Sequence, residues 1–371
     1  MAVKFKKHLI DPGDYEACSV FDVNNDGQLD IVCGAYWYEG PNFTTKHQIQ
    51  DIARAGEYWD DFSDFPMDVN GDGYMDIVSG SWFGPTLRWL ENPGPAGGLW
   101  KVHHIDPTSN IETIRYYDID GCGTPEVFPN TPGAAQCFYK LVKDENGKGL
   151  GHFRKVCILN SVSGHGMGFA DVNSDGRMDV ILTEGWLECP ADPVNDPWVF
   201  HREFNLNLGG MMNVPTLGFD VNGDGLTDLI VGQGHGYGLY WFEQHIEPSG
   251  RRVWIPHEIE GTQSQYHDQC LVDIDNDGQL ELVTGSRYKA HNGNDPGEHN
   301  PIHTSYFKID QKTGTFTRFI IDEGVAAEPG TPDSASGVGI YMWIADLKGS
   351  GRLDIVAPGK EGLYVFENVG E

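Results

Sequence analysis

The chain alternates short runs of β-branched and aromatic residues with loops rich in Asp, Asn and Gly. Runs such as LDIVCG at 29–34 and TDLIVG at 227–232 are typical of buried strands. Each is followed by an aromatic stretch, such as GLYWFEQ at 238–244, and then by a further strand pattern, such as LWKVHHID at 99–106. No stretch sustains the apolar spacing of an amphipathic helix. The pattern therefore predicts an all-β chain with few helices.

An acidic phrase recurs along the whole chain. It reads DVNNDGQLDIV at 22, DVNGDGYMDIV at 68, DIDGCGTPEVF at 118, DVNSDGRMDVI at 171, DVNGDGLTDLI at 220, DIDNDGQLELV at 273 and DLKGSGRLDIV at 346. A period of about 50 residues fits one four-stranded blade of a β-propeller. The repeat thus predicts one seven-bladed propeller over residues 1–371, although length alone would suggest two or three domains.

The ends of the chain predict how this ring closes. The seventh repeat stops at its third strand, GLYVFENVGE, and lacks an outer strand. Residues 3–10, VKFKKHLI, match the outer-strand pattern. We therefore expect the N-terminal strand to complete the last blade and remove an exposed sheet edge.

The acidic phrases predict structural calcium sites. The pattern D-x-[DN]-x-D-G-x-x-[DE] places oxygen ligands at alternating positions of a tight loop, which is the chemistry of a hard cation. It is not an EF-hand, because the closing carboxylate is the ninth residue and a strand follows. The third copy has Cys122 at a ligand position, and the seventh has Lys348 and Ser350, so we expect no ion in the seventh. The complete copies supply Asp22, Asn24, Asp26, Asp30, Asp68, Asn70, Asp72, Asp76, Asp171, Asn173, Asp175, Asp179, Asp220, Asn222, Asp224, Asp228, Asp273, Asp275, Asp277 and Glu281.

This phrase resembles the calcium-binding propeller repeats called FG-GAP or VCBS repeats, and the likeness covers the whole chain. Such repeats occur in integrin heads, bacterial surface proteins and some sugar-processing enzymes. The resemblance implies a fold and says little about function.

Charge and composition exclude several classes of partner. The chain has 25 Lys and Arg against 55 Asp and Glu, a net charge of −30, which disfavours nucleic acid. No apolar run is long enough for a membrane span, and no secretory signal is visible in the first residues. We therefore expect a cytoplasmic protein, or a secreted one if a signal has been removed from this sequence. The odd count of 7 cysteines, without a C-x-x-C pair, indicates neither a disulfide framework nor a zinc ribbon.

Candidate chemistry gathers on the face opposite the acidic loops. There, the segments that precede the innermost strands and those that link second to third strands surround the mouth of the central channel. We expect catalytic residues among His165, His235, His267, Arg287, Tyr288 and His291. We expect substrate contacts from Arg115, Trp37, Trp59, Asp60, Asp61, Trp82, Glu184, Trp186, Tyr237 and Lys360, although at least half of the four tryptophans should instead pack within blades.

Aromatic platforms beside charged groups suit a sugar. Glycoside hydrolysis would need two opposed carboxylates, for which Glu184 with Asp60 or Asp61 are candidates. β-Elimination would need a base, a cation and an acid, and the excess of His, Arg and Tyr favours it. In that reaction Arg287 would neutralise a carboxylate or enolate, and Tyr288 or His291 would protonate the leaving oxygen.

The three histidines at 165, 235 and 267 leave two alternatives. They would hold one divalent metal as neutral ligands, or one of them would act as the general base. Because no fixed ligand spacing is visible, we slightly favour direct acid–base catalysis.

The segments GHGMGFAD, SQYHDQ and SRYKAHNG also resemble those of seven-bladed rhamnose–glucuronate lyases and of the propeller of aldos-2-ulose dehydratase. This resemblance implies a carbon–oxygen lyase or dehydratase that acts on a uronide or keto-sugar. The alternative is a non-catalytic propeller that binds a carbohydrate or a protein. A binder has no need of several titratable groups at one place, which favours an enzyme.

Overall fold

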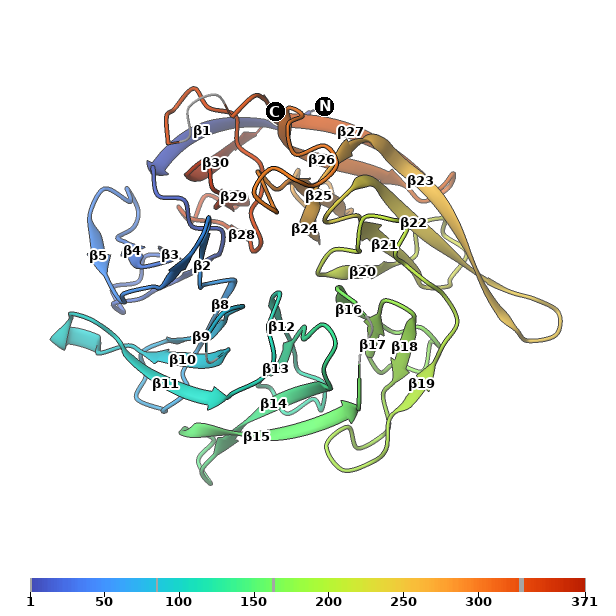
Figure 1. Ribbon diagram of the computed structural model, residues 1–371, viewed down its shortest axis with the longest axis horizontal. Coiled ribbons are helices and arrows are strands. Elements are labelled where there is room, and N and C mark those ends of the chain that lie inside the picture. Colours follow the sequence, from blue (N-terminus) through green and yellow to red (C-terminus); the bar gives the residue numbers. More distant parts are fainter. Residues whose placement is uncertain (1, 85, 162–163, 327–329, 371) are drawn as a thin grey trace.

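The structure is a computed structural model that describes residues 2–84, 86–161, 164–326 and 330–370. In these residues the strands form five four-stranded sheets, one eight-stranded sheet and one two-stranded hairpin, with a single short 3-10 helix, η1 (Gly94–Ala96). The sheets lie around a central axis (Figure 1). This is the arrangement of a β-propeller, and the expectation of an all-β chain with few helices is confirmed.

The strands of the N-terminal half follow one another in sheet order. The first sheet contains β2 (Cys18–Phe21), β3 (Asp30–Cys33), β4 (Tyr36–Tyr38) and β5 (Lys46–Gln48). The hairpin of β6 (Arg54–Ala55) and β7 (Tyr58–Trp59) precedes a sheet of β8 (Ser63–Met67), β9 (Asp76–Gly80), β10 (Leu87–Glu91) and β11 (Lys101–Asp106). The next contains β12 (Ile114–Tyr117), β13 (Glu126–Pro129), β14 (Gln136–Lys143) and β15 (Gly149–Leu159).

The eight-stranded sheet joins two antiparallel units of four strands. One unit contains β16 (Met167–Ala170), β17 (Asp179–Leu182), β18 (Gly185–Glu188) and β19 (Val199–His201). The other contains β20 (Thr216–Phe219), β21 (Asp228–Gly232), β22 (Tyr237–Ile246) and β23 (Arg252–Ser264). The units meet through β16 and β20, which pair in parallel at Gly168↔Thr216 and Phe169↔Leu217.

The remaining sheets bring the ends of the chain together. One contains β24 (Tyr266–Val272), β25 (Glu281–Ser286), β26 (Ile302–Asp310) and β27 (Thr315–Gly324). The last contains β28 (Trp343–Ala345), β29 (Asp354–Ala357), β30 (Leu363–Gly370) and β1 (Lys4–Asp11). β1 pairs antiparallel with β30 from Phe5↔Asn368 to Leu9↔Tyr364, so the predicted pairing of the N-terminal strand is confirmed.

The hydrophobic core lies between neighbouring sheets. One cluster joins Phe65 and Trp89 of the β8–β11 sheet to Val127 and Tyr139 of the β12–β15 sheet. Each sheet thus buries both of its faces against others, which leaves the strand ends and connecting loops to form the two rims of the ring. No helix in the described residues has the length and apolar character needed to cross a membrane.

The cysteines correct one expectation. Cys137 and Cys157 form a disulfide between β14 and β15, where they lie directly opposite one another. This pair was not predictable from the cysteine count, because a count does not reveal which residues lie opposite one another in neighbouring strands.

Candidate functional site

Four buried side chains converge where strand ends meet near the axis. Glu112 lies just before β12, His165 just before β16, His235 between β21 and β22, and His267 within β24. All four residues are at most 6% exposed. Chain segments far apart in sequence therefore build this centre, which we call the His₃Glu centre.

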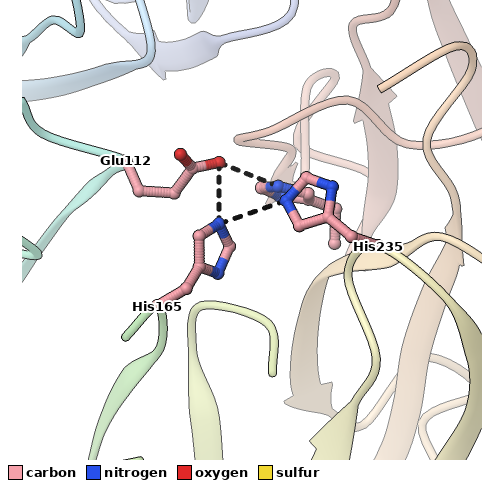
Figure 2. Close-up of side chains that lie close together, drawn as sticks. Glu112, His165 and His235 are labelled. Carbon is pink, nitrogen blue, oxygen red and sulfur yellow. Dashed lines mark hydrogen bonds and ion pairs between the residues drawn. The ribbon is translucent and has the colours of Figure 1, made fainter. Parts of the chain in front are cut away.

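The ligand atoms of the His₃Glu centre face one another (Figure 2). Glu112 Oε1 lies 2.9 Å from His267 Nε2 and 3.2 Å from His165 Nε2. His235 Nε2 lies 3.3 Å from His165 Nε2. One ligand atom from each residue lies within 4.8 Å of every other, which is the spacing of donors around a shared metal ion.

The outer nitrogens of two histidines are held by hydrogen-bond acceptors. His165 Nδ1 lies 2.7 Å from the Met212 carbonyl oxygen, and His235 Nδ1 lies 2.7 Å from Asp295 Oδ2. An N–H on each Nδ1 leaves the Nε2 lone pair directed at the centre, which is how metal-binding histidines are usually oriented. His267 Nδ1 is buried and has no hydrogen-bond partner in the described part of the chain.

Arg287 closes the centre on one side. Its guanidinium donates to both carboxylate oxygens of Glu16, over 2.8 and 3.2 Å, and Nη1 lies 3.1 Å from His267 Nε2. Glu16 thus balances the charge of this buried guanidinium. Lys360 Nζ lies 3.8 Å from Glu16 Oε2 and 4.3 Å from the ring centre of Tyr58.

The pKa values of the three histidines are shifted by burial and by the charges near them. Burial lowers the pKa of His235 to about 4, against the hydrogen bond with Asp295. Burial and the charge of Arg287 lower the pKa of His267 well below its usual value. Burial opposes charge on His165, but Glu112 outweighs it and raises the pKa of that imidazole. Two of the three histidines are thus neutral at pH 7, as metal ligands must be.

A further histidine lies at the edge of the centre. The ring of His291 stacks on that of His235, with 4.1 Å between ring centres, and its Nδ1 lies 2.9 Å from Asp295. Its side chain is 46% exposed. Asp295 therefore orients two imidazoles at once, one directed inward and one accessible from solvent.

Most of the other predicted residues lie outside this cluster. Trp37 stacks on His47 of β5, and Trp186, 1% exposed, donates to Glu203, so these two pack within sheets. Trp59 donates to Asp14, and Glu184 pairs with Arg202. Tyr288 packs beside Ile302, Ala326 and Ala335. The remaining ones are held as follows: Asp60 accepts from the backbone of Trp82 and Phe83, Asp61 accepts from Ser79, and Tyr237 accepts from Asn300.

Arg115 lies deeper in the ring. It pairs with Asp268 over 2.6 Å and lines a cavity of about 660 Å³ with Tyr116, Phe169 and Trp343. Arg115 lies three residues after Glu112 and Asp268 directly follows His267, so this ion pair joins the two chain segments that carry Glu112 and His267.

Sequence reasoning missed the carboxylates of the site. Glu112, Glu16 and Asp295 are three of 55 acidic residues, and none stands in a distinctive motif. The available signal was position, since Glu112 precedes an innermost strand as His165 does. Tyr58, whose pKa burial raises to about 12, was also missed, because it stands in no distinctive motif.

The acidic loops are held by their own backbone. In the loop at 220–228, Asp220 accepts the N–H groups of Asp224 and Gly225, and Asn222 also accepts from Asp224. The sixth residue, Gly225, has a φ of +85°, which glycine adopts without strain. Carboxylate and amide oxygens at the first, third and fifth positions are the donor set that calcium prefers. These residues fit a calcium ion in this loop.

Comparisons with known proteins support the fold. Residues 220–284 match the FG-GAP-like repeat family. A crystal structure of BBS1N in complex with ARL6DN, soaked with mercury, superimposes with a TM-score of 0.51 at 10% identity, over 99% of this chain and 96% of that one. A second crystal, soaked with lead, gives 0.52 at 9% identity, over 100% and 97%. No curated protein is similar enough in sequence to count as a match. At these identities the likeness shows a β-propeller fold and nothing of function.

Proposed function

We propose that the chain is a carbohydrate-active carbon–oxygen lyase or dehydratase that acts by β-elimination on a uronide or keto-sugar at the His₃Glu centre. The observation that carries the proposal is the convergence of three imidazole nitrogens and one carboxylate oxygen, all buried, at one place. A propeller that only binds a ligand has no need of such a cluster.

We also propose that the ring has seven blades, with the eight-stranded sheet counted as two. The support is that its halves, β16–β19 and β20–β23, are each complete antiparallel units joined by two residue pairs. Each unit contains one copy of the acidic phrase between its first and second strands, as the other four-stranded sheets do.

The centre would hold one divalent transition metal through Nε2 of His165 and His235 and Oε1 of Glu112, and through Nε2 of His267 once the Arg287 guanidinium, which donates to that atom over 3.1 Å, gives way. Nitrogen-rich sites of this kind suit zinc, iron, cobalt or manganese better than calcium. Bound there, the ion would supply positive charge for the oxygen of a substrate carboxylate or ketone. We favour this over direct acid–base catalysis by these histidines, because their Nε2 atoms face each other and Glu112 instead of solvent.

Proton transfer then falls to groups at the edge. His291, oriented by Asp295, would remove the proton from the carbon next to the carbonyl or carboxylate. The C–H electrons form the C=C bond, the β C–O bond breaks, and the leaving oxygen takes a proton. Tyr58 would supply that proton, since its hydroxyl donates to the carbonyl oxygen of Ala290, the residue before His291.

The test is activity on a panel of uronides and keto-sugars, followed by the ultraviolet absorbance of the unsaturated product. His291→Ala should lower the rate by roughly 10²–10⁴ with little change in bound metal. His235→Ala should lower both the rate and the metal content found by elemental analysis. The exposed His104 on β11 supplies the control, His104→Ala, which should change neither. Full activity in His291→Ala and in metal-free protein would contradict the proposal.

A second candidate is a protein-binding propeller. The specific observation in its favour is that the similar BBS1N structures were solved in complex with ARL6DN. Calcium in the complete acidic loops fits either candidate. Failure of every sugar in the panel, together with a protein that retains no metal, would favour the binder.

A further inference from the structure

Lysine ammonium groups stand inside two of the acidic loops. Lys308 of β26 pairs with Asp275, lies 2.9 Å from Asp277 Oδ2, and is 3.8 Å from Glu281 Oε1. These three carboxylates belong to the loop at 273–281, whose ligand pattern is complete in sequence. The ammonium group therefore lies among the atoms that would surround a calcium ion.

The loop at 118–126 repeats this arrangement. Lys140 of β14 pairs with Asp120, lies 2.8 Å from Glu126 Oε1, and is 3.2 Å from Cys122 Sγ. Lys140 and Lys308 occupy corresponding places, each directly after two aromatic residues on the third strand of its sheet.

The other five units carry the opposite charge at this place. The residue there is Glu in each, and each Glu contacts a histidine of the outer strand. The pairs are Glu39 with His47, Glu91 with His103, Glu188 with His201, Glu243 with His257, and Glu367 with His8. In two of these units the loop Asn contacts that Glu, as Asn173 does with Glu188 and Asn222 with Glu243. In the described residues, this place therefore carries a positive charge in the two units with Lys140 and Lys308, and a carboxylate in the other five.

An ammonium group and a calcium ion cannot share one set of carboxylates, because the two cations repel at contact distance and compete for the same oxygens. We propose that Lys308 and Lys140 are the resident cations of the loops at 273–281 and 118–126, so that neither loop takes calcium. Calcium binding is then left to loops without an internal lysine. In the described residues, no Lys or Arg pairs with the acidic side chains of 22–30, 68–76 or 220–228, whereas Asp175 of the fourth loop contacts Arg177.

The experiment counts calcium per chain by elemental analysis after dialysis of the full chain against buffered calcium. Lys308→Met should gain one calcium ion per chain, and in chelator it should melt below wild type because its carboxylates repel. The control is Lys312→Met, an exposed lysine of the turn that follows β26, which should leave the count and the melt unchanged.

Two further variants test the assignment without removing a lysine. Asp224→Asn should lower the wild-type count by one, because 220–228 has no internal cation. Asp277→Asn should leave the count unchanged. Loss of one calcium ion in Asp277→Asn, or no gain in Lys308→Met, would overturn the proposal for 273–281. An unchanged count in Asp224→Asn would overturn the assignment of calcium to 220–228. None of these readouts depends on catalysis, so they stand or fall apart from the proposed lyase activity.

Discussion

Glu361 is a carboxyl group held inside the ring without a full set of partners. The residue is 1% exposed, its Oε1 accepts the Gly337 N–H over 2.7 Å, and its Oε2 has no partner in the described residues. Burial raises its pKa to about 7, against that hydrogen bond. Because the folded pKa exceeds that of the unfolded chain, the folded state binds more protons at mildly acidic pH. The contribution of Glu361 to the free energy of unfolding is therefore fully present at low pH, and it is lost as the pH rises through about 7.

Glu361→Gln removes this cost while keeping the oxygen that accepts from Gly337. We expect the variant to be more stable than wild type by about 1–3 kcal/mol at pH 8, with little difference near pH 4. Denaturant unfolding at both pH values measures this. Glu145→Gln, at an exposed turn, is the control and should show no such dependence. Equal stability of Glu361→Gln and wild type at pH 8 would show that the buried carboxylate carries no penalty.

At the same scale, sequence identified some site residues and not others. His165, His235 and His267 were recognisable because few histidines occupy strand ends on that face. Arg287 was predicted as a site residue, but its ion pair with Glu16, 271 positions away, was not predicted. Lys308 was invisible as a loop cation, because the loop and β26 are separate in sequence. Pairings across the ring depend on strand register, which a residue pattern does not contain.

At the scale of strands and loops, the carboxylate of the ninth residue of the acidic phrase accepts backbone hydrogen bonds that hold the loop against its sheet. Asp228 is fully buried, its Oδ2 accepts the Val221 N–H over 2.9 Å, and its Oδ1 accepts the Gln244 N–H over 2.8 Å. The same pair of bonds recurs in four other four-stranded units, at Asp30, Asp76, Asp179 and Asp354. This carboxylate thus has a structural role that does not require an ion.

We therefore expect the stability lost on replacing Asp228 to be independent of calcium, and the stability lost on replacing Asp224 to depend on it. Asp228→Ala leaves two buried N–H groups without acceptors and should cost about 2–5 kcal/mol both in calcium and in chelator. Asp224→Ala should lower the melting temperature mainly in calcium, because its oxygens lie at the exposed ligand positions. Thermal melts of both variants in the two buffers measure this. A loss in Asp228→Ala that disappears in chelator would mean that this residue acts through the ion.

The strands were largely predictable, and the sheet boundaries less so. Short apolar runs after each acidic phrase marked the second strands, such as β3 and β21. The parallel contact of β16 with β20 was not predicted. It depends on Gly168, where a Cβ atom would lie 1.9 Å from the Thr216 carbonyl oxygen, so only glycine admits the neighbouring strand so closely. A glycine in a strand pattern signals a close approach but not its partner.

For the whole molecule, the repeat period made the fold predictable, and the pairing of β1 with β30 joins the two ends of the chain in one sheet. β1 covers Tyr364 and Phe366 of β30, and Lys7 reaches onward to Asp322 of β27 in the neighbouring sheet. The N-terminal strand therefore bonds the last sheet and also links it to the preceding one. Local patterns predicted that β1 would pair with β30, but not that Lys7 would join two sheets.

Deleting residues 1–10 should open the ring at this place. The free edge of β30 would expose unpaired backbone groups and the apolar side chains that β1 now covers, and such an edge is a template for association. We expect a lower melting temperature and oligomers or aggregates in light scattering. A synthetic peptide of residues 1–11, added in excess, should restore the melt because it binds only the folded edge. A peptide with Phe5 and Leu9 replaced by Ser is the matched control and should restore less. A truncated protein that remains monomeric with an unchanged melt would show that the ring does not depend on its N-terminal strand.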